Sequence, residues 1–248
     1  MRILLLDIEN SPNLAHCWGL WQQNISLAQL QQSAYVMCYA AKWLGEEFVY
    51  YDSVNISSRR NMMKGIHALL DQADAVVHYN GKRHDIPLLN KEFLELGMKP
   101  PSPYKQIDLL ETSKRIFKFP SNKLEYVCRA LKIGKKVEHI GHELWTRCMA
   151  KDQEAWKLME EYNIHDVVLL EEVYNKMLPW IKSHTNHSLY NQDSYCCPNC
   201  GSHKVQKRGF HKTLHSVFQR FQCKDCGSWS KDNKILNRQQ YKLTSIQE

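Results

Sequence analysis

The hydrophobic and polar positions of this 248-residue chain follow two periods, one typical of strands and one typical of helices. Short apolar runs bounded by polar residues predict strands, and apolar residues three or four apart predict helices. We expect strands at 1–7, 35–43, 48–53, 73–79 and 107–110, and helices at 59–71, 85–96, 121–134 and 154–177. Ser121 is the expected cap of the third helix, and Pro179 ends the last one. This order predicts an α/β domain, a mixed sheet flanked by helices.

Composition divides the chain into unequal parts. We expect a domain at 1–182, a polar linker at 183–195, a cysteine-containing module at 196–233, and a basic, disordered tail at 234–248. Residues 195–248 hold ten Lys and Arg against three acids, so they carry the whole net charge of +7. A basic appendage on a neutral body predicts a polyanionic partner. A solvated tail with no partner is the alternative.

Several classes of protein are disfavoured by composition. No apolar run approaches the roughly 18 residues that a membrane span needs, and the N-terminal run is too short for a signal-peptide core. We therefore expect a cytoplasmic protein. In that reducing compartment the nine cysteines are not expected to form a disulfide framework.

Four carboxylates and one phenol fall at positions that suit a composite metal site. Asp7 and Glu9 are two residues apart at a strand end and share a face, whereas Tyr162 and Asp166 are one helical turn apart. Asp85 follows a strand and a turn. Carboxylates crowd together only when cations offset their repulsion, and a pair of Mg²⁺ or Mn²⁺ ions with oxygen ligands cleaves phosphodiesters. The set predicts a nuclease; surface acids beside a core tyrosine are the alternative.

The same stretches resemble the three motifs of the DEDD superfamily of 3′–5′ exonucleases, which share a ribonuclease H-like fold and include the proofreading domains of DNA polymerases. The first motif matches 7–9, the second 80–85 and the third 162–166, and 123–136 looks like the segment that precedes the third. Tyr162 resembles the tyrosine subclass, as in family B polymerases, because the histidine subclass carries histidine where Glu161 stands. The resemblance covers roughly residues 1–180. His84 departs from it, since an apolar aromatic residue usually precedes the second-motif aspartate.

The resemblance also implies roles for these residues. Asp7 is expected to bridge both ions, Glu9 and Asp166 to hold the ion that activates water, and Asp85 to support the second. Tyr162 is expected to orient the attacking water, because a phenol with a pKa near 10 is a poor base. Asn80 is expected to contact substrate or to shape its motif. His139, His142 and His165 are expected to be surface or packing residues rather than metal ligands.

Two Cys-x-x-Cys pairs predict one structural zinc ion. Four thiolates with this spacing suit tetrahedral zinc and leave no position open for catalysis. The expected ligands are Cys197, Cys200, Cys223 and Cys226, with Cys196 as an alternative to Cys197. This module looks like the zinc ribbons near the ends of many transposases, which suggests a phage or mobile-element source.

Basic and aromatic residues alternate between the two cysteine pairs. Such a pattern presents cations to phosphate and rings to bases. The residues predicted to contact nucleic acid are Lys207, Arg208, Phe210, Lys212 and Arg220. A ribbon that binds protein, or only stabilises the chain, is the alternative.

Together these features predict a two-metal 3′–5′ exonuclease whose zinc ribbon recruits nucleic acid, with DNA favoured over RNA. Two other functions remain open. One is a structure-specific endonuclease on the same fold, and the other is a nucleic-acid-binding factor that has lost activity.

Overall fold

A computed structural model describes residues 1–135, 137, 140–182, 184–190 and 195–238. The chain divides into two compact units. Arg2–Tyr174 is called the sheet unit below. Asn175–Glu248, grouped with Met1, is called the ribbon unit. Each is described by itself.

The sheet unit is built on five strands in the order β5-β4-β1-β6-β7. The strands are β1 Ile3–Asn10, β4 Val36–Trp43, β5 Val49–Ser53, β6 Ala75–His78 and β7 Lys105–Asp108. β1 pairs antiparallel with β4 and parallel with β6, so the predicted mixed sheet is confirmed. β1 lies at the centre because its apolar residues are buried on both faces of the sheet.

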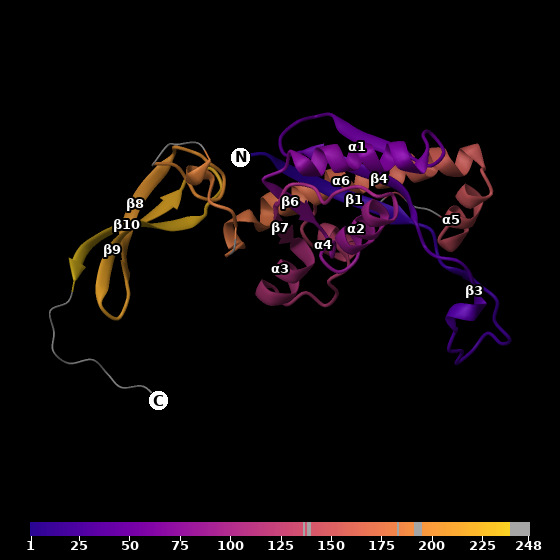
Figure 1. The fold of residues 1–248 in the computed structure, drawn as a ribbon. Coiled ribbons are helices and arrows are strands. Elements are labelled where there is room, and N and C mark those ends of the chain that lie inside the picture. The colour runs from indigo at the N-terminus through magenta and orange to yellow at the C-terminus, as the bar shows by residue number, and fades with distance from the viewer. Residues whose placement is uncertain (136, 138–139, 183, 191–194, 239–248) are drawn as a thin grey trace. The chain divides into compact units, whose positions relative to one another are not determined.

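Helices flank this sheet, as predicted (Figure 1). They are α1 Arg59–Asp71, α2 Asp85–Glu95, α3 Leu109–Ile116, α4 Leu124–Ala130, α5 His142–Met149 and α6 Gln153–Met177. Leu4, Leu6 and Ile8 of β1 pack in one cluster with α1 and α2. Side chains alternate along a strand, so Asp7 and Glu9 point to the opposite face.

Three local expectations were wrong. The predicted strand at 107–110 ends at Asp108, because the Asp108 side chain accepts hydrogen bonds from two backbone N–H groups of α3 and caps that helix. Ser121 does not cap α4, whose N-cap is Lys123; instead the Ser121 hydroxyl accepts a bond from the Lys123 N–H at 3.3 Å. α4 ends at Ala130, before the expected stop at Gly134. α3 and α5 were not predicted.

An arm formed by residues 11–34 was also not predicted. It contains β2 Leu14–Ala15, the short 3₁₀ helix η1 Leu27–Gln29 and β3 Leu30–Gln32, and β2 pairs with β3. The arm begins directly after β1 and returns directly into β4, so it projects beyond the ends of these two neighbouring strands (Figure 1).

The ribbon unit contains a three-stranded antiparallel sheet in the order β10-β9-β8. Its elements are η2 Leu178–Trp180, η3 His187–Leu189, β8 Val205–Lys212, β9 Ser216–Cys223 and β10 Trp229–Arg238. β10 includes 234–238, which were expected to belong to a disordered tail, and η3 lies inside the predicted linker. Residues 191–194 and 239–248 lie outside the described residues. In the part of the chain that is described, no helix has the length and apolar character needed to span a bilayer.

Candidate active site and zinc site

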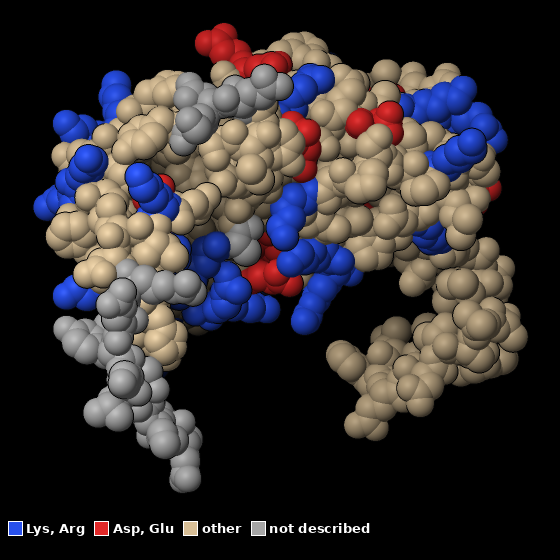
Figure 2. Space-filling view, turned by 60° about the vertical axis from the view of Figure 1, so that its left-hand side comes forward, with Lys and Arg blue, Asp and Glu red and all other residues tan. Residues whose placement is uncertain are grey.

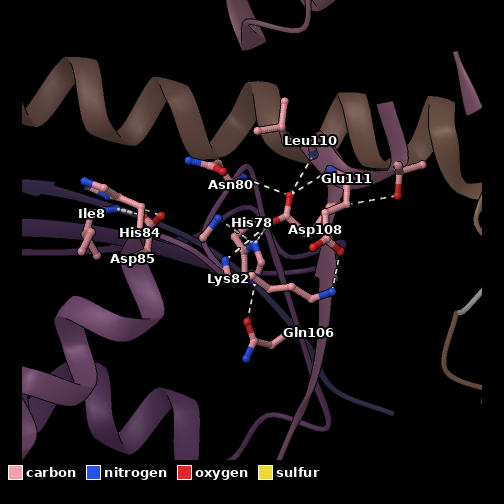
Figure 3. Close-up of polar contacts among 12 residues, drawn as sticks. Ile8, His78, Asn80, Lys82, His84, Asp85, Gln106, Asp108, Leu110 and Glu111 are labelled. Carbon is pink, nitrogen blue, oxygen red and sulfur yellow. Dashed lines mark hydrogen bonds and ion pairs between the residues drawn. The ribbon is translucent and has the colours of Figure 1, made fainter. Parts of the chain in front are cut away.

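The end of β1 brings the first two acidic motifs together. The backbone N–H of Ile8, which lies between Asp7 and Glu9, donates to Asp85 Oδ1 at 3.3 Å (Figure 3). Asp85 is the first residue of α2 and its side chain is buried. The second-motif carboxylate therefore lies against the strand that carries the first motif.

The third motif reaches the same strand from α6. Asn163 Nδ2 donates to Asp7 Oδ2 at 2.7 Å, a contact between residues 156 positions apart. Tyr162 and Asp166 flank Asn163 on α6 and are both buried. The three stretches that are far apart in sequence thus converge at one end of β1.

The electrostatics of the site reflect this convergence. Burial raises the pKa of Tyr162, and the charges of Asp166, Glu9 and Asp7 raise it further. The phenol therefore stays protonated at neutral pH and can donate a hydrogen bond but cannot act as a base. Burial also raises the pKa of Asp85, against the opposing influence of His84.

The chemistry of this donor set fits hard divalent cations. It consists of carboxylate oxygens, and two of its members, Asp85 and Asp166, are almost fully buried, where uncompensated negative charge is costly. No three of these acids, however, have ligand oxygens that all lie within 4.8 Å of one another among the described residues. A cage for a single ion is therefore not preformed.

Asp108 shapes the loop that leads to Asp85 (Figure 3). Its carboxylate accepts from the backbone N–H groups of Asn80 at 3.0 Å and Lys82 at 3.3 Å, as well as from α3. Burial alone would raise the pKa of Asp108, but His78 and the N–H donors outweigh it and lower that pKa to about 2. Asn80 has a φ of 71° and contributes its backbone to this network, consistent with a role in shaping the motif.

Gly81 is required by the same loop. Its N–H donates to Nδ1 of the buried His78 at 3.1 Å, and the other ring nitrogen of His78 contacts Gln106 Oε1 at 3.1 Å. A Cβ at Gly81 would lie 2.4 Å from the imidazole Cγ. Any side chain there would push the imidazole away and shift the loop before Asp85.

The histidines divide by position. The His84 side chain is 54% exposed and its Nδ1 lies 3.8 Å from Asp85 Oδ2, so it does not pack as the usual apolar residue would. His165 contacts the backbone oxygen of Lys135 at 2.7 Å, which is a packing role. His142 begins α5, and His139 lies outside the described residues.

Sequence reasoning missed three residues that support the site. Asn163 positions Asp7, and Asp108 fixes the loop before Asp85. Trp145 of α5 packs edge-on against the ring of Tyr162, with centroids 6.2 Å apart. The position of Asn163 between Tyr162 and Asp166 was the only available signal.

The four predicted zinc ligands form a closed set. Cys197, Cys200, Cys223 and Cys226 are the one group of three or more potential ligands in the described residues whose ligand atoms all lie within 4.8 Å of one another. The sulfurs of Cys197 and Cys226 are 3.6 Å apart, and those of Cys200 and Cys223 are 3.7 Å apart. Tetrahedral zinc with Zn–S bonds near 2.3 Å requires a separation of about 3.8 Å. The residues present therefore fit zinc.

Backbone geometry supports both knuckles in the same way. Gly201 and Gly227 have φ values of 74° and 79°, and each donates its N–H to the carbonyl of the first cysteine of its pair. Burial alone would raise the pKa of Cys223, but N–H groups of the knuckle lower it to about 7. Cys196 lies outside the four-sulfur group, so the geometry favours Cys197 as the ligand.

The ribbon sheet separates the predicted nucleic-acid contacts onto two faces. Lys207, Phe210 and Lys212 pair with Phe221, Gln219 and Val217 of β9, and so share one face. Arg208 and Arg220 lie on the other face, where their guanidinium carbons are 5.9 and 4.7 Å from the ring centroid of Trp229. Lys231 lies there too, with its Nζ 4.0 Å from the ring of Phe218. We call Arg208, Phe218, Arg220, Trp229 and Lys231 the aromatic–cation face.

Comparison with known proteins agrees with this fold. The family model described as the RNase_H superfamily matches residues 27–178, a range that begins after β1 and includes Asp85, Tyr162 and Asp166. The structure also resembles the family B DNA polymerase of the hyperthermophilic archaeon Pyrobaculum calidifontis, with a TM-score of 0.55 and 18% identity over 72% of this chain. The match spans 25% of that polymerase, and at this identity it supports the fold alone. No curated protein matches this chain by sequence. The expected ribonuclease H-like fold is confirmed.

Proposed function

The chain belongs to the RNase_H superfamily, and on that basis we propose that it is a metal-dependent 3′–5′ exonuclease. The observation that carries the proposal is the convergence of three acidic stretches at the end of β1. Asn163 bonds Asp7 from α6, and the Ile8 N–H bonds Asp85 from α2. A merely structural role would not explain why buried acids are gathered beside other acids.

The proposed roles follow from the chemistry of each side chain. Asp7, Glu9, Asp85 and Asp166 would hold two Mg²⁺ or Mn²⁺ ions, which supply activation of water and stabilisation of developing charge in phosphodiester hydrolysis. Tyr162 would orient the attacking water through its hydroxyl, since burial and the surrounding carboxylates raise the pKa of the phenol and keep it protonated.

We further propose that the ribbon unit binds one structural zinc ion and recruits nucleic acid, with DNA favoured. The aromatic–cation face supports this role, because cations beside rings suit a phosphate backbone with unstacked bases. On the opposite face Phe221 is buried and its ring packs edge-on against Tyr195, with centroids 5.6 Å apart, whereas Phe210 is 56% exposed. Because Arg220 and Lys231 lie directly beside the rings of Trp229 and Phe218, we propose them as the preferred phosphate contacts ahead of Lys207 and Lys212.

The decisive experiment incubates end-labelled single-stranded DNA and RNA, linear and circular, with Mg²⁺ or Mn²⁺. We expect a ladder that shortens from the 3′ end, with circles spared. Cleaved circles would identify the endonuclease alternative. Binding without cleavage under all conditions would identify the inactive binding factor.

A further inference from the structure

The arm is the most exposed apolar feature of the described residues. Trp18 is 97% exposed and Trp21 is 83% exposed. Four aliphatic side chains in the same arm are also exposed: Leu14, Leu20, Ile25 and Leu27. Exposed apolar side chains gathered on one short segment are typical of an interaction site.

The arm is also free of charge. Residues 11–41 contain no Asp, Glu, Lys or Arg, although the chain carries 33 basic and 26 acidic residues. Figure 2 shows the arm as a tan protrusion without blue or red, in contrast to the mixed charges elsewhere on that view. Nucleic acid is a poor occupant for such a surface, since phosphate binding needs cations.

Hydrogen bonds fix the base of the arm to the sheet unit. Ser11 and Tyr35 bond to each other through Ser11 N–H to Tyr35 O at 2.9 Å and Tyr35 N–H to Ser11 Oγ at 3.0 Å. Lys91 of α2 donates to the backbone oxygen of Ala34 at 2.6 Å. The arm therefore presents its apolar residues from an ordered base.

We propose that the arm is a self-association surface through which two copies of this chain form a symmetric dimer. In a two-fold interface the same patch meets itself, so a charged residue near the axis would face its own copy. A patch without charged residues avoids that repulsion, whichever of its residues lie near the axis. The arm supplies such a patch.

The arm contains a pocket as well as protruding apolar side chains. A pocket of about 560 Å³ is lined by Ala15, His16, Cys17, Trp18, Ala28 and Gln29. In the proposed dimer, Trp21 of each copy occupies this pocket on the other, which is the reciprocal contact that a two-fold axis requires. Two buried tryptophans contribute roughly 300–500 Å² per copy. With four aliphatic neighbours they approach the roughly 800 Å² per partner of a stable interface.

The test is sedimentation velocity on the full, zinc-loaded chain between about 1 and 100 µM, a range that reports affinities typical of homodimers. We expect a dimer whose mass persists at high salt, because the contact contains no charges. Trp18→Ser/Trp21→Ser should raise the dimer dissociation constant by about a hundredfold or more. Trp180→Ser is the matched control, since Trp180 is 56% exposed outside the arm.

Folding is not at risk in these variants, because both indoles of the arm lie in solvent, and unchanged thermal unfolding should verify this. A wild-type chain that stays monomeric at the highest concentration would overturn the proposal. So would a double variant that dimerises like the wild type. Measuring oligonucleotide affinity in parallel identifies the other occupant: a monomeric chain whose affinity falls in the double variant would assign the arm to nucleic acid.

Discussion

The sheet unit and the ribbon unit each gather four potential metal ligands, but they differ in how much apolar core holds those ligands in place. In the sheet unit a large apolar core holds acids from distant segments close together, although they repel one another. In the ribbon unit few apolar side chains are buried, and the four cysteine sulfurs are already arranged for an ion. The acidic site of the sheet unit therefore depends on the packed core, whereas the fold of the ribbon unit depends on metal binding. Metal removal and point substitutions should therefore affect the two units differently.

The largest expected difference concerns zinc. Structural zinc contributes on the order of 10 kcal/mol to the folding of small domains. Cys197→Ser/Cys200→Ser should lose the single zinc equivalent and the protease resistance of the ribbon, while unfolding of the sheet unit stays unchanged. Elemental analysis and limited proteolysis measure both outcomes. Protein purified without chelators that contains no zinc would contradict the expectation.

The next effect is on catalysis and should leave folding intact. Asp7→Ala should lower the cleavage rate by about a thousandfold or more, because the cations lose a shared ligand. Tyr162→Phe should keep measurable activity, since it removes an orienting hydroxyl and no ligand. Glu154→Gln is the matched control, because Glu154 is 92% exposed. Single-turnover cleavage rates of the three variants measure the effect. A folded Asp7→Ala variant that cleaves at the wild-type rate would refute the proposed site.

A smaller effect concerns the free energy of unfolding of the sheet unit, and not the binding of metal or substrate. The folded pKa of Asp108 is about 2, below its ordinary value of 3.8, so its stabilising contribution is present above about pH 4 and is lost as pH falls toward 2. Asp108→Asn should cost about 2 kcal/mol at pH 7. Urea unfolding should show the gap between variant and wild type narrowing at pH 3. A gap that is constant with pH would disprove the electrostatic origin.

The smallest expected effect tests the two faces of the ribbon. Arg220→Gln/Lys231→Gln should flatten the log–log salt dependence of single-strand binding by about 1.4, at roughly 0.7 per lost phosphate contact. Lys207→Gln/Lys212→Gln removes the same charge from the other face and should change the slope less. Fluorescence anisotropy at several salt concentrations measures it. Equal slopes for the two double variants would mean that net charge alone recruits nucleic acid.

Sequence predicted the parts of the fold in which local pattern and burial agree. α1 has the bounds that its apolar spacing predicted, and the mixed sheet was expected from the order of elements. The arm could not be predicted, because its exposed tryptophans and leucines carry the composition of a core. α5 was missed because its eight residues are too few to display a clear period.

The candidate site also contains a part that local sequence pattern predicts and a part that it does not. Acidic residues at strand and helix ends could be chosen from spacing. The support that Asn163 and Asp108 give them could not, because it depends on contacts between distant segments. Likewise, strict alternation along β8 would place Phe210 on the face of Arg208, but a bulge between Lys207 and Phe210 places Phe210 on the face of Lys207 instead.

The Asn163–Asp7 contact has a consequence for the order of folding. It closes a loop of 156 residues, and contacts of such long range form late because chain entropy opposes them. During synthesis, β1 emerges with Asp7 long before α6 supplies Asn163, Tyr162 and Asp166. We therefore expect nascent chains to remain without a complete acidic centre until α6 has docked. The ribbon, whose cysteine pairs are close in sequence, can assemble locally as soon as it emerges.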